Sequence, residues 1–355
     1  MLSLSEAPMG HIVFLITYLS EHTADKERGR ANTMVSILSG LIPLFVFLGN
    51  VLILYGLFCW HGSRRINVRS PLTRNLLRSP GQFLIKQTED LTLDLECHTV
   101  MMAVMPLLLY SSYLSLRYFG AAAEAGHTWV IYALLGVAST VYYGHKICGL
   151  LTQRQAYRLG LDCEMAVGQE LNNLMSEGYR VYHDVPGQGF NIDHVLVGHN
   201  GVFAVETKGR SKPVTGSVTV VYDGRTLRFP DRITTDYLDQ ARRQAKWLSR
   251  QLCEITGEAV PVQPVLVVPG WYVERARRGD VLVLNGRGDC NFIVNQWSSA
   301  RLSRDLIQKI SNILEQACRD VAPITCRQEA PKQQRPSEVL ARIGPMGRLD
   351  KASGH

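Results

Sequence analysis

The chain has 355 residues, of which 46% are hydrophobic, and it carries a formal net charge of +7 at pH 7. This length accommodates two or three domains, and the positive charge favours polyanionic partners, either nucleic acid or anionic lipid headgroups. Eight cysteines are scattered without a Cys-x-x-Cys pair or histidines at zinc-site spacing, which argues against both a disulfide framework and a zinc ribbon.

Three apolar runs without charged side chains dominate the first 155 residues. The first, from Ala31 to Trp60, has thirty residues without an Asp, Glu, Lys or Arg, whereas a bilayer-spanning helix needs roughly 20 predominantly apolar residues. The two later runs are shorter, and the alternative for the last is a buried core helix of a soluble protein. We predict a membrane region over residues 1–155, with about three transmembrane helices at roughly 36–60, 99–117 and 128–150.

Basic residues between the first two predicted spans indicate the orientation, because short cytoplasmic loops retain Lys and Arg. This loop carries Arg64, Arg65, Arg69, Arg74, Arg78 and Lys86. The link between the second and third spans offers only Arg117, near its start. We therefore expect a multi-pass protein of the cell inner membrane with everything after Lys146 in the cytoplasm, although three basic residues at 26–30 favour the opposite orientation.

Beyond Thr152 the sequence changes to short alternating elements, a pattern typical of a compact α/β domain. Strands are predicted at 179–185, 192–197, 202–207, 265–268, 281–284 and 292–294, with a hairpin formed by 218–222 and 226–229. Helices are predicted at 167–176, 235–255 and 302–318. We expect an α/β domain over 160–295, a closing helix within 296–320, and a basic, disordered tail over 321–355, which has little to bury.

Two of these strands flank the short turn Gly198-His199-Asn200-Gly201. If the loop residues are His199 and Asn200, Asp193 faces Glu206 across the hairpin. If they are Asn200 and Gly201, Asp193 faces Lys208 instead. Both registers place Asp193, Glu206 and Lys208 on one side of the sheet, because strand side chains alternate between the two faces.

Directly opposed side chains have Cβ atoms about 5 Å apart, so two carboxylates and an ammonium are expected within a few ångströms. Like charges this close are unfavourable unless a cation lies between them, which favours a divalent ion such as Mg²⁺ with oxygen ligands. The lysine would then orient or activate an attacking water. The alternative is a salt-bridged cross-strand pair on a solvated sheet face.

This part of the chain resembles the nuclease-related domain (NERD) family, a branch of the PD-(D/E)xK nuclease superfamily. The residues that carry the resemblance are Gly168-Gln-Glu170, Ile192-Asp193-His194, the segment from Gly201 to Lys208, and Gln240. It covers about residues 160–295, and Ile192-Asp193 stands where the superfamily has Pro-Asp. The resemblance implies a bacterial, restriction-endonuclease-like domain with a mixed central sheet flanked by helices, here anchored to a membrane.

The family also implies roles for individual residues. Asp193 and Glu206 would bind Mg²⁺ or Mn²⁺, with Glu170 completing or supporting the metal site. Lys208 would assist the nucleophile, and Gln240 would contact the substrate or the edge of the site, with Gln244 as a possible substitute. The implied activity is hydrolysis of phosphodiester bonds in DNA, with RNA as an alternative substrate, and no organic cofactor is expected.

The predicted 235–255 helix has a basic outer face that suits contacts with phosphate groups. Its members are Arg242, Arg243, Lys246 and Arg250. His194 is next to Asp193 in sequence, but the alternation of side chains points it to the other sheet face, which favours a structural role. The competing functional hypothesis is a non-catalytic module that tethers nucleic acid or another protein to the membrane.

Overall fold

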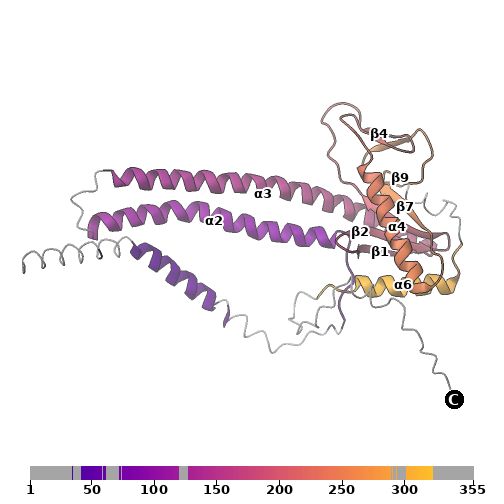
Figure 1. Ribbon diagram of the computed structural model, residues 1–355, viewed down its shortest axis with the longest axis horizontal. Coiled ribbons are helices and arrows are strands. Elements are labelled where there is room, and N and C mark those ends of the chain that lie inside the picture. The colour runs from indigo at the N-terminus through magenta and orange to yellow at the C-terminus, as the bar shows by residue number, and fades with distance from the viewer. Residues whose placement is uncertain are drawn as a thin grey trace, which may run out of the picture. The chain divides into compact units, whose positions relative to one another are not determined.

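The computed structural model describes residues 34, 41–57, 59–60, 72, 74–119, 127–288, 290, 293 and 301–322. The chain divides into two compact units (Figure 1). The first comprises Met1–Arg65 and Leu93–Leu151, and the second comprises Ile66–Thr92 and Thr152–His355.

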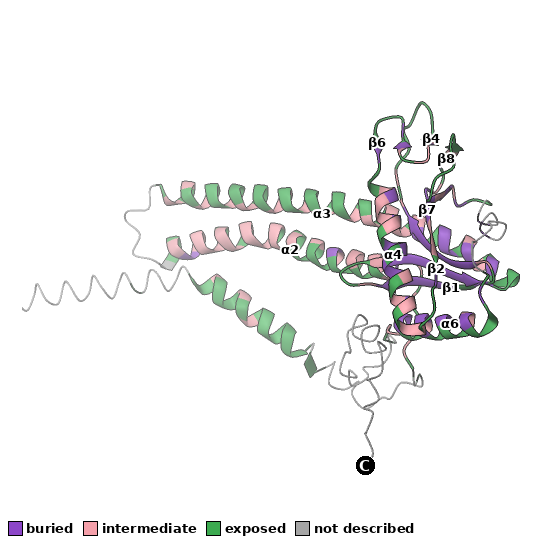
Figure 2. Cartoon of the chain, turned by 45° about the vertical axis from the view of Figure 1, so that its right-hand side comes forward, coloured by how far each residue is buried: buried purple, intermediate pink, exposed green. Residues whose placement is uncertain are grey.

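The first unit consists of apolar helices. It holds the helix Leu41–Leu57, most of α2 (Gln82–Phe119) and the first half of α3 (Thr128–Asn172). Within the unit, α2 and α3 are joined by aromatic contacts such as Tyr113–Tyr132, whose ring centroids are 5.9 Å apart. Figure 2 shows these helix segments almost entirely exposed or half-buried.

Among the described residues, one helix, Gln82–Tyr118, is long and apolar enough to cross a membrane, and Leu41–Leu57 is apolar but shorter. The predicted span 99–117 lies inside α2, and 128–150 forms the first half of α3. Of the predicted span 36–60, residues 41–57 and 59–60 are helical, and the rest lies outside the described residues.

The second unit is built on two small sheets. The main sheet has the order β1-β2-β3-β7-β9, with bounds β1 Arg180–Pro186, β2 Asn191–Gly198, β3 Gly201–Thr207, β7 Val262–Val267 and β9 Leu282–Leu284. Its first three strands are antiparallel, and β7 and β9 continue parallel to β3. A second sheet has the order β6-β5-β4-β8, with β4 Thr219–Tyr222, β5 Leu227–Arg228, β6 Ile233–Thr234 and β8 Tyr272–Arg275.

Helices cover both faces of the main sheet, and its strands β2 and β3 are therefore buried along almost their whole length. On one face, the end of α3 inserts Val167 and Leu171, and the 3-10 helix η1 (Asn173–Glu177), which follows it directly, adds Leu174. On the other face lie α4 (Asp236–Thr256) and α6 (Arg304–Cys318). The predicted mixed sheet flanked by helices is thus confirmed.

Helix α4 matches the predicted 235–255 helix closely, with a buried stripe that runs at spacings of three or four residues from Leu238 to Leu252. It ends at Gly257, whose φ of +72° is the left-handed conformation that glycine adopts without strain. Helix α6 begins after Ser303, whose side chain accepts a hydrogen bond from the Leu306 amide.

Several elements differ from the prediction. The expected 167–176 helix is the end of α3, which runs without interruption from Thr128 and is followed by η1. Strands β6 and β8 were not predicted, and the expected strand 292–294 is described only at Ile293, which is helical. The expected tail lies outside the described residues from residue 323 onward.

A segment ahead of α2 belongs to the second unit. Leu76 forms an antiparallel bridge with Val321. The Arg78 guanidinium donates two hydrogen bonds to Asp320, at 2.8 and 2.7 Å, and one to the Asp184 carboxylate at 3.1 Å. These contacts connect the segment to residues distant in sequence on β1 and beyond α6.

Candidate functional site

The β2–β3 hairpin brings two carboxylates together. Its paired residues run from Gly198↔Gly201 to His194↔Val205, which is the first of the two predicted registers. Continued by one pair, this register aligns Asp193 with Glu206. Both side chains are buried, with 6% and 2% of their residue surface exposed, so their charges are poorly screened by water.

The surrounding atoms hold both carboxylates in place. The Thr207 amide donates to Oδ2 of Asp193 at 2.7 Å. Lys208 Nζ lies 2.5 Å from Oε1 of Glu206, and Gln244 Nε2 lies 2.5 Å from Oε2. The same Gln244 nitrogen lies 3.1 Å from the Asn191 carbonyl oxygen. The α4 residue that touches the pair is therefore Gln244, one turn beyond Gln240.

A third carboxylate, Glu164 on α3, faces the same group of charges. Burial raises the pKa of Glu164 to about 8, and the carboxylates of Asp184 and Glu206 add to the effect. Burial, followed by Glu206 and Glu164, also raises the pKa of Asp193 well above its ordinary value. The Glu164 Oε2 atom is buried without a hydrogen-bond partner among the described residues.

The charges at this site do not balance. Burial lowers the pKa of Lys208, but Glu206 and Asp193 outweigh that effect and raise it overall. This single ammonium faces three acidic side chains, because Asp184 is already paired with Arg78. Burial is the main cause of the raised pKa values of Asp193 and Glu164, and this deficit of positive charge adds to it.

The predicted residue Glu170 lies elsewhere on α3. It is half-buried and six residues beyond Glu164, which corresponds to about 9 Å along the axis and about 120° around it. Glu164 was missed because the helix was expected to begin at residue 167. A signal was nevertheless present, since Glu164 extends the stripe formed by Val167, Leu171 and Leu174 at helical spacing.

A histidine pair lies on the opposite face of β1 and β2, under α3. His183 and His194 are cross-strand partners whose Nδ1 atoms are 2.9 Å apart. His183 Nε2 lies 3.1 Å from Asn172 Oδ1, so its proton belongs on Nε2, and His194 then donates from its own Nδ1. Burial lowers the pKa of His183 to about 4, which keeps it neutral. The pair packs the sheet against α3.

The predicted nucleic-acid-binding residues separate into different surroundings. Arg242 is held by Asp280 through two hydrogen bonds of 2.7 Å and by Asp239 at 2.8 Å. Arg243 lines a cavity of about 300 Å³ together with Phe190 and both glutamines, Gln240 and Gln244. Lys246 and Arg250 border a more open hollow of about 600 Å³ beside Asp280.

The acidic side chains have the chemistry of a site for a hard divalent cation, since carboxylate oxygens are the ligands that Mg²⁺ and Mn²⁺ prefer. The raised pKa values of Asp193 and Glu164 are consistent with a site that a cation would stabilise, because a cation supplies the missing positive charge. Within the described parts of the chain, no three His, Cys, Asp or Glu side chains are grouped closely enough to hold a metal ion. Both oxygens of Glu206 are engaged by Lys208 and Gln244.

Comparison with known proteins gives a family match in this part of the chain. A family model described as "NERD: Nuclease-related domain" matches residues 159–269. That segment includes Glu164, Asp193, Glu206, Lys208 and Gln244, and it supports the resemblance to the NERD family. No curated protein and no solved structure gives a significant match.

Proposed function

We propose that this protein, whose NERD-matching segment indicates a nuclease-like function, is a metal-dependent nuclease that hydrolyses phosphodiester bonds in DNA. The observation that carries the proposal is the pair of buried carboxylates, Asp193 and Glu206, on two adjacent strands of that segment, with the half-buried Lys208 directly after β3. Two carboxylates with one ammonium suit phosphodiester hydrolysis, because the reaction needs a polarised phosphate and a positioned water.

Asp193 and Glu206 are the residues that would hold Mg²⁺ or Mn²⁺, and Glu164 would add negative charge beside them from α3. Such an ion, when bound, neutralises charge on the phosphate and lowers the pKa of a bound water. Asp193 is oriented by the Thr207 amide, and Glu206 is oriented by Gln244. The protein thus fixes the carboxylate oxygens before any ligand arrives, which reduces the cost of organising the site.

Lys208 would act on the substrate. Its side chain is a quarter exposed and therefore reaches the surface of the site, whereas Glu206 beside it is buried. It remains protonated, because Glu206 and Asp193 raise its pKa. A charged ammonium here donates hydrogen bonds to a non-bridging phosphate oxygen or holds the attacking water.

The cavity next to Gln244 would receive a neighbouring part of the substrate. Phe190 is packed edge-on against Trp247 there, with ring centroids 5.2 Å apart, and offers an apolar wall. Gln240 and Arg243 add polar groups to the same cavity. We assign Gln240 and Arg243 to substrate contacts and Gln244 to support of Glu206.

The test uses the full-length chain purified in detergent. We expect it to cut DNA with Mg²⁺ or Mn²⁺ and not in chelator, and Asp193→Asn to lower the rate by roughly 100-fold or more because a charged oxygen ligand is lost. Asp162→Asn is the matched control, because Asp162 is an exposed carboxylate on α3. Linear, circular and single-stranded DNA and RNA are compared in parallel. Equal rates for Asp193→Asn and the wild type would overturn the proposal.

One observation favours a second candidate, a non-catalytic tether that holds nucleic acid or protein at the membrane. Lys208 and Gln244 together occupy both oxygens of Glu206, as they would in a purely structural ion pair. The same assay separates the two functions. A tether binds nucleic acid in chelator and does not cut it, whichever divalent ion is added. A nuclease loses all cleavage in chelator and regains it when metal is added.

We further propose that the first unit anchors the protein in the cell inner membrane with three spans and places the second unit in the cytoplasm. The support is the length and apolar composition of α2 and the exposed apolar face of α3 formed by Leu134, Val137 and Val141. Residues at spacings of three and four share one helix face, and lipid would cover such a face.

A further inference from the structure

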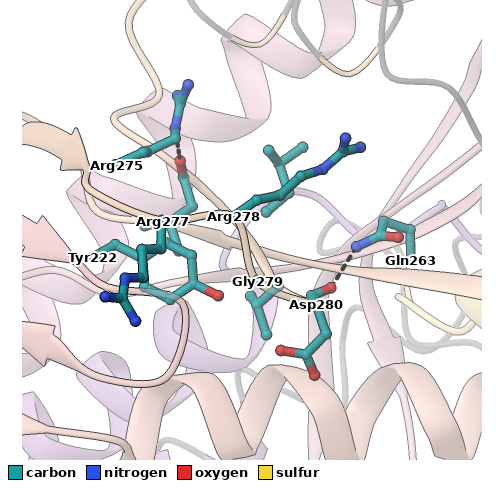
Figure 3. Close-up of a pocket in the computed structure, with 10 residues that line it drawn as sticks. Tyr222, Gln263, Arg275, Arg277, Arg278, Gly279 and Asp280 are labelled. Carbon is teal, nitrogen blue, oxygen red and sulfur yellow. Dashed lines mark hydrogen bonds between the residues drawn. The ribbon is translucent and has the colours of Figure 1, made fainter.

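An arginine-rich loop joins β8 to β9 and borders a cavity of about 460 Å³. Arg275, Arg277 and Arg278 line it from one side, and Gln263 and Asp280 complete its polar wall (Figure 3). The figure shows the side chains of Arg275, at the end of β8, and of Arg277 and Arg278, in the loop, pointing in different directions. Arg275 Nε donates a hydrogen bond to the carbonyl of Val283 on β9 at 2.9 Å. No residue of this loop belongs to the carboxylate site.

The loop has a fixed shape. The amide of Ala276 donates to the carbonyl of Tyr222 at 2.9 Å, and the Tyr222 hydroxyl donates to the carbonyl of Gly224 at 3.3 Å. A Cβ atom on Gly279 would lie 2.0 Å from that hydroxyl oxygen, so this position accepts only glycine without a shift of the loop. The backbone that carries the arginines is therefore organised in advance, which lowers the entropic cost of binding.

The charge on the cavity is not neutralised from within. Asp280 is the one carboxylate among its described lining residues, and both of its oxygens accept hydrogen bonds from Arg242 at 2.7 Å. Within the described residues, no acidic side chain forms an ion pair with Arg277 or Arg278. Arg242 thus neutralises the charge of Asp280, and Arg277 and Arg278 remain available to bind an anion.

The positive surface continues along α4. Asp280 also borders the hollow lined by Lys246 and Arg250, so the two cavities adjoin at this neutralised carboxylate. Arg242 and Lys246 lie two residues from Gln240 and Gln244, respectively, which is about 200° around the helix. The arginine loop and the carboxylate site are therefore on opposite flanks of α4.

We infer that this surface, the arginine tract of Arg277, Arg278, Lys246 and Arg250, is a second binding site for the phosphate groups of a nucleic-acid backbone. The inference rests on the proposed nucleic-acid substrate but not on cleavage. Side chains that point in different directions suit successive phosphates of a polymer, whereas one compact anion requires convergent donors. The tract holds the strand outside the site of hydrolysis and so favours long substrates.

The test measures binding of the full-length chain in detergent and chelator, in an Asp193→Asn background, across a salt series. Arg277→Ala/Arg278→Ala is compared with Arg301→Ala/Arg304→Ala, which removes the same charge from two exposed arginines near α6. We expect the first pair to weaken binding of a long oligonucleotide by roughly 10-fold and to reduce the salt slope by about 1.5, because each phosphate contact contributes about 0.7 to 0.9. The control is expected to bind as the parent does.

Several outcomes overturn the inference. One is equal binding by the two double variants. Another is binding of inorganic phosphate or a mononucleotide that depends on Arg277 and Arg278 while oligonucleotide binding does not, which would make the site one for a free anion. Thermal unfolding verifies that each variant is folded. If no metal supports cleavage but the Arg277→Ala/Arg278→Ala variant still loses affinity, the proposed nuclease activity is refuted and the second binding site is kept. If the protein cuts DNA but this variant binds as tightly as the parent, the nuclease activity is kept and the second binding site is refuted.

Discussion

Glu164 shows how burial gives a single carboxyl group a chemical role. Its pKa of about 8 means that the group is mostly protonated at neutral pH without a cation. A divalent ion beside Asp193 and Glu206 would favour the charged form and release this proton, because opposite charge lowers a carboxyl pKa. At the proposed metal site, Glu164 would therefore couple the binding of metal to pH, whereas an exposed carboxylate on the same helix would not.

We predict that Glu164→Gln lowers metal-dependent cleavage by roughly 10- to 100-fold, the effect of weakening a metal site without removing its principal ligands. Glu170→Gln is the matched control on the same helix and is expected to stay within about twofold of the wild type. Initial cleavage rates measured across a Mg²⁺ series test both variants. Loss of activity in Glu170→Gln with full activity in Glu164→Gln would contradict the assignment and favour the residue predicted from the sequence.

The histidine pair predicts how the stability of the second unit depends on pH. The pKa of His183 falls from an ordinary 6.5 to about 4 on folding, so the unfolded chain binds more protons between these values. Stability from the neutral ring is complete above pH 6.5 and is lost as the pH falls towards 4, by about 3 kcal/mol. Denaturant unfolding followed by tryptophan fluorescence should show this loss.

The variant His183→Gln should lose less stability over the same pH range, because the glutamine side chain does not titrate. His199→Gln is the control, since His199 is an exposed residue in the turn between β2 and β3. It should show the full loss seen in the wild type. An equally steep loss of stability in His183→Gln would show that other groups, and not this ring, determine the acid response.

At the scale of elements, the sequence pattern correctly predicted those helices and turns whose formation depends on contacts between residues close together in the chain. The stripe of α4 and the β2–β3 turn involve contacts within one helix or one hairpin, so the spacing of apolar residues and the turn residues were sufficient. The first of two registers is correct, and it aligns Asp193 with Glu206. Strand β8 is short and mostly exposed, so it lacked the apolar alternation that identifies a strand.

Other features depend on contacts between distant segments. Gln240 and Gln244 lie on the same flank of α4, and only the position of the whole helix over β3 determines that Gln244 reaches Glu206. Arg78 pairs with Asp184 and Asp320, which are 106 and 242 residues away in the chain. No local pattern predicts such pairs. The start of α3 was misplaced because apolar and amphipathic stretches join in one helix with no breaker between them.

At the scale of the whole molecule, α2 and α3 connect the apolar unit to the sheet unit, since both helices begin or end within the second unit. If α2 and α3 each cross a bilayer, the turn between them lies on the side opposite to the sheets. Three exposed residues sample these positions: Ser79 before α2, His127 in the turn, and Glu177 after α3. Their accessibility from either side of the membrane therefore tests the proposed topology.

We predict that in a cysteine-free chain a membrane-impermeant thiol reagent labels His127→Cys in cells whose inner membrane is intact, because the positively charged loop before α2 keeps the sheet unit inside. Ser79→Cys and Glu177→Cys should react only after that membrane is permeabilised. Labelling of all three positions from one side would show that α2 and α3 do not cross the bilayer. Labelling of Ser79→Cys and Glu177→Cys from outside, with His127→Cys protected, would instead reverse the orientation and place the carboxylate site away from cytoplasmic DNA.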